Sequence, residues 1–422
     1  MLNEIKKLAD DCPCGQRHLI KTDTAVVGSD ASDRLCGYVS ERFKAPLIVC
    51  DANTEKYVHR LTGRLHSAEV IVLSGASHAD EKGVEPLLER LKANEYDCLI
   101  ACGSGSLHDI TRYCANERSI PFISYPTAAS VDGFVSTVAA MTWKGQKLSS
   151  PAAAPIALFA DEAVFTDAPE RLTASGVGDI LGKFTALCDW KLAHILTGET
   201  ICPEIFGLTE RALGELLKLL ERRAKGEISA SDTEYTRLVM ESLVLAGLSM
   251  QLQGSSRPAS GAEHHLSHLW EMHLINSPTS ALHGEQVGVA SLLLCDFYRR
   301  RIYEGFDFTR PIDLKATFDR SYIEPVFGKL TDGILAENLD SGRPESSPLN
   351  FRADASAAAS ARAEASKLIS PDKLLRYLSI AGAPTSLAGL GLPQSDDFIE
   401  KSLAYAPYVR RRLTLLKILS AK

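Results

Sequence analysis

Short apolar runs alternate with amphipathic segments from Thr24 to about Phe165. Apolar runs bounded by turn residues are typical of buried strands, and they fall at Ala25–Gly28, Pro46–Cys50, Glu69–Leu73, Cys98–Ala101 and Phe122–Tyr125. Between them, apolar residues recur at three- and four-residue spacing, which predicts helices at Asp33–Phe43, Thr54–Leu65 and Val84–Asn94. Strand–helix alternation of this kind predicts a parallel sheet covered on both faces, with ligands at the carboxyl ends of its strands.

The pattern changes after Ala168-Pro169, where strand-like runs cease. Long amphipathic segments follow at Ile180–Leu196, Leu208–Lys225, Thr233–Gln253 and Leu282–Arg301. We therefore predict an α/β Rossmann-like domain over residues 1–168 and an all-α domain over residues 169–422, with the active site in the cleft between them. The Ala/Ser-rich segment Asp354–Ile369 is predicted to be an exposed helix without convergent chemistry.

Composition narrows the class of protein. The 422 residues are 45% hydrophobic and 23% charged, with a net charge of −7, as in an ordinary globular protein. An acidic chain without a long basic run does not favour nucleic-acid binding, and no apolar run approaches the roughly 20 residues that span a bilayer. We expect a cytoplasmic protein whose ten cysteines are reduced.

Histidines gather near the start of the last third of the chain, with five of the eleven between His264 and His283. His264 and His268 stand one helical turn apart, so both can face one cleft. Imidazole is a common ligand of divalent metals, and Asp179, which we expect near a helix N-terminus, offers a carboxylate oxygen for an Asp/His/His site with an open position. The alternative is a polar helix whose histidines only cap, pack or face water, and this is the commoner role of a single histidine.

A second group of possible ligands lies in Cys12-Pro-Cys14-Gly-Gln-Arg-His18. Its CxC spacing matches no common structural zinc pattern, and no distal pair of ligands accompanies it. The sequence alone therefore does not predict a metal site there.

A glycine-rich turn, Cys102-Gly-Ser-Gly-Ser-Leu-His-Asp109, joins a predicted strand to a helix-like segment. Glycines admit an anion close to the backbone, and a helix N-terminus presents free N–H groups to a pyrophosphate. The spacing lacks the full GxGxxG pattern, so a plain tight turn is an equal alternative. Asp51, directly after a predicted strand, suits a ribose hydroxyl and would favour NAD over NADP, or else it caps the helix near Thr54.

The polar stretch from Tyr125 to Ser136 follows another predicted strand. Its hydroxyls and the Asp132 carboxylate would lie at the carboxyl edge of the sheet, where they could bind a nicotinamide ribose or substrate hydroxyls. The alternative is a loop that satisfies its own backbone.

Taken together, the motifs GSGSLHD, PTAASVDG with Ser136, SGVGD, RPASGAEHHLSH and LHGEQVG, in this order, resemble the sn-glycerol-1-phosphate dehydrogenases, especially the bacterial type. These belong to the superfamily of glycerol dehydrogenases, iron-type alcohol dehydrogenases and dehydroquinate synthases. The likeness spans about Ala25 to Val289 and does not extend to the Ala-rich segment or to the CPCGQRH string.

The resemblance implies a role for each matching residue. Asp179, His264 and His283 would bind one divalent metal, zinc or nickel. His268 and Asp179 would be catalytic, and both, with Asp132, would contact substrate, whereas His265 and His273 would be structural. The implied cofactor contacts are Gly105, Ser106, Leu107, His108, Asp109, Thr127, Ala128, Ala129, Ser130 and Ser136. The residue patterns described above add Asp51 and Gly103 to the predicted cofactor contacts.

The implied activity is the reversible NAD(P)H-dependent reduction of dihydroxyacetone phosphate to sn-glycerol-1-phosphate, with NAD(H) preferred and Arg257 or Lys183 as candidate phosphate partners. Alternatives are a metal-dependent glycerol or polyol dehydrogenase, a dehydroquinate synthase-like lyase, and a non-catalytic nucleotide-binding homologue. We expect a small phosphorylated substrate and a homo-oligomer of two or more chains, without nucleic-acid or membrane partners.

Overall fold

The computed structural model describes residues 2–74, 78–339 and 348–421. The chain divides into two compact units: unit 1 comprises Met1–Gly176 and Gly214–Ser256, and unit 2 comprises Val177–Leu213 and Arg257–Lys422. This division differs from the single boundary predicted after Ala168, because a part of the later helical sequence belongs to unit 1. The two units are defined by contacts within the folded chain and not by independent folding, so the predicted domains stay a prediction.

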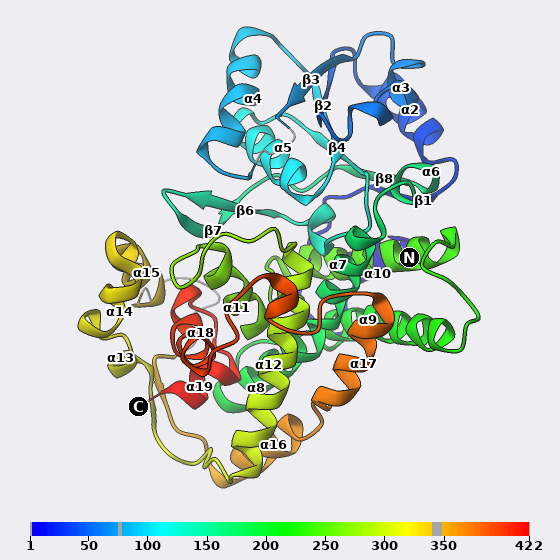
Figure 1. The fold of residues 1–422 in the computed structure, drawn as a ribbon. Helices are drawn as coiled ribbons and strands as arrows, with labels where there is room; N and C mark the ends of the chain where they lie inside the picture. Colours follow the sequence, from blue (N-terminus) through cyan, green and yellow to red (C-terminus); the bar gives the residue numbers. More distant parts are fainter. Residues whose placement is uncertain (1, 75–77, 340–347, 422) are drawn as a thin grey trace. The chain divides into compact units, whose positions relative to one another are not determined.

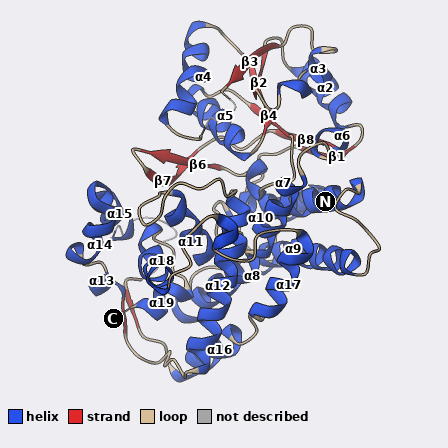
Figure 2. Ribbon diagram, in the orientation of Figure 1, coloured by secondary structure: helices blue, strands red, loops and turns tan. Residues whose placement is uncertain are grey.

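Unit 1 is built on a six-stranded parallel sheet, drawn in red in Figure 2. The strands are β1 (Thr24–Gly28), β2 (Pro46–Asp51), β3 (Glu69–Leu73), β4 (Cys98–Gly103), β5 (Phe122–Pro126) and β8 (Ala157–Asp161), in the order β1-β8-β5-β4-β2-β3. The five predicted strands are present, each within two residues of its predicted ends. The sixth strand, β8, inserts between β1 and β5, and a separate antiparallel hairpin joins β6 (Val138–Trp143) to β7 (Gln146–Pro151).

Helices cover both faces of this sheet, as predicted (Figure 1). One core gathers side chains of α2 (Ala31–Arg42) and α3 (His59–Thr62), and the other those of α4 (Glu81–Ala93) and α5 (Gly105–Arg118). Strands β2, β4 and β5 are buried almost throughout, which explains why their sequences are continuously apolar and do not alternate. The helix predicted at Thr54–Leu65 is shorter, because a 3₁₀ turn, η1 (Glu55–Tyr57), precedes α3.

The long helix α10 (Thr233–Gln253) also belongs to unit 1. A Cβ at Gly247 would lie 2.5 Å from the Asp132 carbonyl oxygen, so α10 packs directly against the 3₁₀ turn η2 (Asp132–Val135). This packing fixes the backbone that carries Asp132.

Unit 2 is almost entirely helical (Figure 2). The central helices are α8 (Lys183–Thr197), α11 (Ala262–Glu271) and α12 (His283–Tyr303). Helices α16 (Ala355–Ala365), α17 (Pro371–Ala381), α18 (Asp396–Val409) and α19 (Leu415–Ser420) pack around them. The prediction of an all-α part holds except for one short antiparallel pair, β9 (Ile312–Asp313) and β10 (Asn350–Phe351). The predicted Ala-rich helix is α16, but it buries Ala358, Ala361 and Ala365.

A buried aspartate ties three helices of unit 2 together. Asp189 of α8 accepts hydrogen bonds from the backbone N–H of Ala262, at 2.8 Å, and from that of Leu415, at 2.8 Å. It therefore satisfies N–H groups at the starts of α11 and α19, which have no partner within their own helices. This sets the position of α11, the helix that carries His264 and His268.

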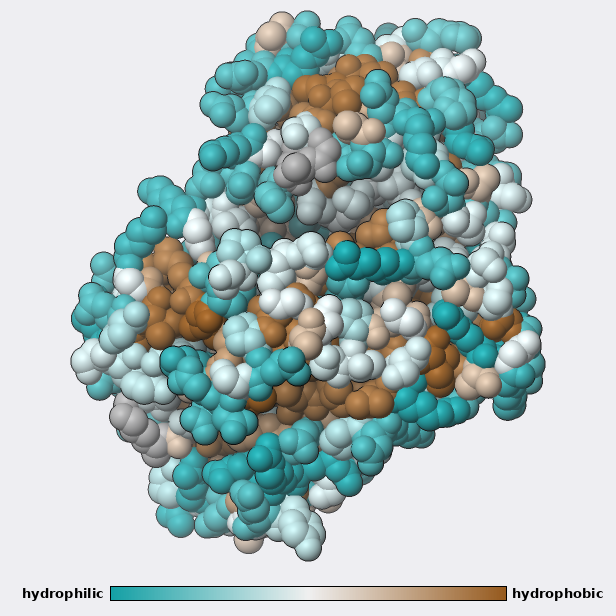
Figure 3. Space-filling view, in the orientation of Figure 1, coloured by the Kyte–Doolittle hydropathy of each residue, from teal (hydrophilic) through white to brown (hydrophobic). Residues whose placement is uncertain are grey.

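Apolar side chains reach the surface in both units. Figure 3 shows apolar patches over the region of β3, whose Val72 is 44% exposed, and over the region of α14 (Arg320–Phe327) and α15 (Thr331–Leu339). Among the described residues, no helix is long and apolar enough to cross a membrane.

Candidate metal and nucleotide sites

All three predicted metal ligands come together in unit 2. Asp179, His264 and His283 each offer a ligand atom, and these atoms lie within 4.8 Å of one another. His264 Nε2 is 3.7 Å from Asp179 Oδ1, and the His264 and His283 ring centroids are 5.2 Å apart. This donor set of one carboxylate and two imidazoles fits a divalent transition metal.

The position of Asp179 differs from the prediction. Asp179 lies in the last turn of α7 (Glu170–Leu181), not near a helix N-terminus, because α7 ends at Leu181 and α8 begins at Lys183. Gly178 explains how this turn approaches His283: a Cβ there would lie 2.3 Å from the carbonyl oxygen of Gly284, in the first turn of α12. Glycine at 178 therefore lets the Asp179 turn pass directly beside His283.

Two glutamates orient the histidine ligands. Glu263 Oε1 is 2.8 Å from His264 Nδ1, and Glu271 Oε1 is 2.6 Å from His283 Nδ1. A carboxylate at Nδ1 holds the proton there, which leaves Nε2 with the lone pair that a metal requires. Glu263 also accepts a 2.6 Å hydrogen bond from Thr185 Oγ1. Both glutamates lie in α11, the histidine-rich helix itself, but the motifs did not point to them.

His268 lies next to the Asp179, His264 and His283 set but is not a member of it. Its ring centroid is 6.1 Å from that of His264 and 5.7 Å from that of His283. Arg410 Nη2 approaches His268 Nδ1 at 3.5 Å. His268, Glu271 and His283 form a second possible ligand set, which shares His283 with the first. The first set suits a metal better, because Glu271 already accepts the Nδ1 proton of His283.

The negative charge of Asp179 is balanced by a buried lysine. Lys183 Nζ donates a 2.9 Å hydrogen bond to Asp179 Oδ1, and both side chains are buried. Burial raises the pKa of the Asp179 carboxyl, but Lys183 and the two imidazoles together hold it below its usual value. Asp179 is therefore an anion at neutral pH, as a metal ligand must be.

The structure does not support the two predicted phosphate partners. Lys183 is engaged by Asp179, and Arg257 is 2% exposed and held by a bidentate pair with Glu199, with N···O distances of 2.6 and 3.1 Å. Arg257 also donates to the carbonyl oxygen of Leu413 at 3.0 Å. Both cations therefore have structural partners, and Arg410 is the cation that lies next to His268.

The remaining histidines of the cluster lie apart from the ligand atoms. His265 is fully buried, and neither ring nitrogen has a hydrogen-bond partner among the described residues. Burial lowers the pKa of His265 well below its ordinary value, so the ring is neutral. His273 follows α11 in a left-handed conformation, with φ 54°.

The predicted nucleotide loop lies between β4 and α5 of unit 1. A Cβ at Gly103 would lie 2.2 Å from the Leu107 side chain, and one at Gly105 would lie 2.9 Å from Val131 Cγ2. Both glycines are thus required by close packing. Ser104 makes no side-chain cap to α5, so the first turn, which contains Ser106, presents its backbone N–H groups as an anion site would.

Other predicted cofactor residues of this loop are held within the protein. The His108 ring is buried between the carbonyl oxygen of Ser104, at 2.9 Å, and Ser124 Oγ, at 2.9 Å. Leu107 is buried in one core of the sheet, and Asp109 lies 3.6 Å from Arg112 Nε. The buried Leu107 and His108 side chains shape the loop, so any contact of theirs with a cofactor would be through the backbone, whereas the Asp109 side chain is partly exposed.

Asp51 follows β2 and stabilises the next turn. Its Oδ1 accepts hydrogen bonds from the backbone N–H of Asn53, at 2.9 Å, and from the N–H and Oγ1 of Thr54, at 3.0 Å each. Asp51 thus closes the turn that precedes η1, whose N-cap is Thr54 and not Asp51. These bonds all use Oδ1, so a ribose hydroxyl would have to approach Oδ2.

The segment from Thr127 to Ser136 is held by a buried arginine that the sequence analysis did not single out. Arg112 Nη1 donates to the carbonyl oxygens of Ser136, at 2.9 Å, and Val138, at 3.1 Å, and Nη2 donates to that of Gly133. The backbone N–H of Thr127 donates to Gly103 O at 3.1 Å, which joins this segment to the glycine turn. The predicted contacts Thr127, Ala128, Ala129, Ser130, Asp132 and Ser136 are all buried.

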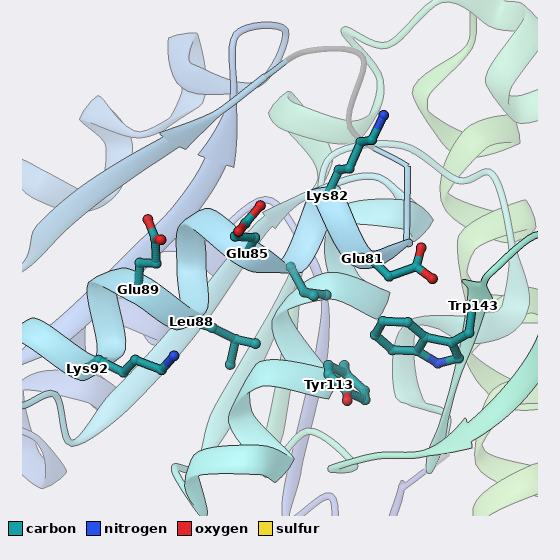
Figure 4. A pocket seen from close by; sticks show the side chains of 9 residues that line it. Glu81, Lys82, Glu85, Leu88, Glu89, Lys92, Tyr113 and Trp143 are labelled. Carbon is teal, nitrogen blue, oxygen red and sulfur yellow. The ribbon is translucent and has the colours of Figure 1, made fainter.

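An open pocket of about 360 Å³ lies elsewhere on unit 1, beside α4 (Figure 4). Three glutamates and two lysines line it along α4, and Tyr113 and Trp143 lie across from them with ring centroids 5.1 Å apart. None of the predicted metal or cofactor residues lines this pocket.

Comparison with known proteins places the chain in a class. Residues 26–169 match the family model described as iron-containing alcohol dehydrogenase. The fold is similar to that of a probable glycerol dehydrogenase from Sinorhizobium meliloti, with a TM-score of 0.62 and 16% identity over 94% of each chain. It is also similar to NADH-dependent butanol dehydrogenase A from Thermotoga maritima, with a TM-score of 0.62 and 14% identity over 95% of this chain and 93% of that one. The fold is thus that of the iron-type alcohol dehydrogenases.

Sequence relatives define the family more closely. A glycerol-1-phosphate dehydrogenase [NAD(P)+] from Bacillus licheniformis is 33% identical over 100% of this chain and 94% of its own length. A protein of the same name from Halalkalibacterium halodurans is 40% identical over 71% of this chain and 76% of its own length. Another, from Pyrococcus furiosus, is 36% identical over 57% of this chain and 66% of its own length. The chain belongs to the glycerol-1-phosphate dehydrogenase family and is an oxidoreductase, which confirms the family resemblance seen in its motifs.

Proposed function

We propose that this protein catalyses the reversible, NAD(P)H-dependent and metal-dependent reduction of dihydroxyacetone phosphate to sn-glycerol-1-phosphate. The observation that carries the proposal is the Asp179, His264 and His283 set, in which Glu263 and Glu271 orient the two imidazoles. The names of the relatives support the substrate and the cofactor type.

These three residues would hold one divalent cation, zinc or nickel. When bound, the cation supplies a Lewis acid that polarises the substrate carbonyl. Asp179 contributes the negative charge of the ligand set, and its pKa below the ordinary value keeps that charge at neutral pH. Glu263 and Glu271 keep the Nδ1 protons of the two histidines in place, so that neither ring turns away.

The remaining residues near the ligand set would act on the substrate. His268 would contact the substrate and donate a proton to its carbonyl oxygen as hydride arrives from the nicotinamide, since an imidazole ordinarily titrates near neutral pH. Arg410, 3.5 Å from His268, offers a guanidinium suited to the phosphate group. No covalent attack by a protein side chain is needed.

Unit 1 would bind the dinucleotide. The glycine turn Gly103–Gly105 and the first turn of α5 would receive the pyrophosphate, and the Thr127–Ser130 segment and Ser136 would provide further cofactor contacts. Asp51 would accept hydrogen bonds from the adenosine ribose and repel a 2′-phosphate, which favours NAD(H) over NADP(H). Asp132 would bind the free hydroxyl group of the substrate.

The test is NADH consumption with dihydroxyacetone phosphate, before and after removal of metal with a chelator, followed by chiral analysis of the glycerol phosphate. We expect turnover that chelation abolishes and zinc or nickel restores, with sn-glycerol-1-phosphate as the product. Turnover of unphosphorylated dihydroxyacetone but not of its phosphate would contradict the proposal in favour of a polyol dehydrogenase.

A further inference from the structure

A second group of metal-ligating side chains lies in unit 1, in the connection between α1 (Leu2–Asp10) and β1. Ligand atoms of Cys12, Cys14 and His18 lie within 4.8 Å of one another, and Cys14 Sγ is 3.2 Å from His18 Nε2. Neither cysteine forms a disulfide. Nothing in the reaction proposed above uses these residues.

A tight turn brings these side chains together. The backbone N–H of Gly15 donates a 2.9 Å hydrogen bond to the carbonyl oxygen of Cys12, and Gly15 has a φ of +75°. Glycine adopts this left-handed conformation without the steric cost that a side chain would carry. The turn explains how ligands spaced as CxC and a histidine four residues later can converge, although their spacing matches no common zinc pattern.

The tautomer of His18 presents a lone pair to the cysteines. His18 Nδ1 is 3.0 Å from the carbonyl oxygen of Leu252, in α10 of the same unit. A carbonyl only accepts, so Nδ1 carries the proton and Nε2, which faces Cys14 Sγ, carries the lone pair. An outer nitrogen bonded to a carbonyl is the usual arrangement around a metal-ligating histidine.

The geometry at Cys14 suits a metal ligand. The backbone N–H of Gln16 donates to Cys14 Sγ at 3.4 Å, which helps to fix the position of the sulfur. A zinc ion with bonds of about 2.3 Å to the Cys14 sulfur and about 2.0 Å to the His18 nitrogen would separate these two atoms by about 3.5 Å in a tetrahedral site. The observed 3.2 Å therefore needs an adjustment of only a few tenths of an ångström.

We propose that Cys12, Cys14 and His18 bind a structural zinc ion, distinct from the metal of the Asp179 site. One further ligand would complete the tetrahedron. Through the His18–Leu252 hydrogen bond, the ion would fasten the α1–β1 connection to α10. Because α10 also packs against the Asp132 turn, the site would stabilise the part of unit 1 that carries Asp132.

The test uses the full chain carrying His264→Ala. This substitution removes a ligand of the Asp179 site, so that metal bound by the cysteines can be measured separately. The protein is loaded with cobalt(II), and its absorption spectrum is examined for a thiolate-to-cobalt charge-transfer band, which only a site with cysteine ligands gives. We expect the band and one equivalent of tightly held metal. We expect Cys14→Ser to abolish both and Cys36→Ser, at a buried cysteine of α2, to retain both.

A folded His264→Ala chain without the band, or a band that survives Cys12→Ser combined with Cys14→Ser, would overturn the proposal. The charge-transfer band is first sought in the His264→Ala chain, which keeps all of its cysteines. Misfolding of a cysteine variant therefore cannot account for a missing band. Serine exchange of each remaining cysteine in turn then tests whether the fourth ligand is a thiolate. The proposal does not depend on the proposed reaction, since activity is not measured.

Discussion

Removing the negative charge of Glu271 should weaken metal binding without disturbing the fold. Glu271 Oε1 lies 2.6 Å from His283 Nδ1, the short distance of a charge-assisted hydrogen bond. In Glu271→Gln the side chain keeps its length and an accepting oxygen but loses its charge. In Glu271→Ala the His283 ring also loses its orientation.

The magnitude follows from what each substitution removes. Loss of a partner that orients a metal ligand typically costs about 10- to 100-fold in metal affinity, or about 1.4 to 2.7 kcal/mol. We expect Glu271→Gln to lie near the lower value and Glu271→Ala near the upper. The dissociation constant is measured by zinc titration of the metal-free protein against a competing chelator.

The control is Glu304→Gln, which alters an exposed ion pair with Arg301 after the last turn of α12, the helix that begins with His283. It should leave the dissociation constant unchanged. Unchanged zinc affinity in both Glu271 variants would refute the reasoning, because it would mean that His283 does not bind metal through an orientation set by Glu271.

Further predictions concern the loop, the buried charges and acid stability. Gly103→Ala should destabilise the protein by about 1–3 kcal/mol in denaturant titrations and weaken NADH binding, because its Cβ meets Leu107; Gly37→Ala, in an exposed and open position of α2, should stabilise the protein by up to about 1 kcal/mol. Arg257→Ala should cost about 1.5–3 kcal/mol of stability by removing the charged hydrogen bonds to the partly exposed Glu199 carboxylate, yet leave the KM for dihydroxyacetone phosphate unchanged. Arg410→Ala should raise that KM by about tenfold or more, the cost of a lost bond to a charged group, and leave the KM for NADH unchanged. Burial lowers the pKa of His108 from 6.5 to about 3 in the folded protein. As the pH falls below 6.5, the His108 imidazole is therefore protonated in the unfolded chain before it is protonated in the folded one, and the free energy of unfolding decreases until the pH reaches about 3. At pH 5.5 the loss is about 1.4 kcal/mol, and His108→Gln should remove this part of the pH dependence in unfolding measurements, whereas His59→Gln, on the surface, should not.

The sequence predicted the sheet well because parallel strands buried on both faces are continuously apolar, as in Pro46–Cys50 and Phe122–Tyr125. It did not predict β8 as a separate strand or place it between β1 and β5, since strand order depends on contacts far apart in the chain. The helical pattern was also read correctly at α10, but periodicity does not tell which core a helix joins, and α10 belongs to unit 1.

For the metal site, the sequence pointed to Asp179, His264 and His283, and the structure brings them together. It misplaced Asp179 relative to its helix because a helix was predicted to begin at Ile180, whereas Asp179 lies in the last turn of α7, whose Gly176 and Gly178 allow close packing. Glu263 and Glu271 could not be recognised, because a carboxylate that orients a histidine is identified by its distance to Nδ1 and not by its spacing. Arg257 could not be excluded as a phosphate partner until its pair with Glu199 was visible.

The central claim is that His264 binds metal and that its neighbour His265 does not. His264 Nε2 faces Asp179, whereas the His265 ring is buried away from the ligand set. The most direct measurement is the metal content per chain of His264→Ala and His265→Ala, each purified with zinc and checked for folding by circular dichroism. We predict that His264→Ala loses one equivalent of zinc relative to the unaltered chain and that folded His265→Ala loses none; full metal content in His264→Ala would contradict the account.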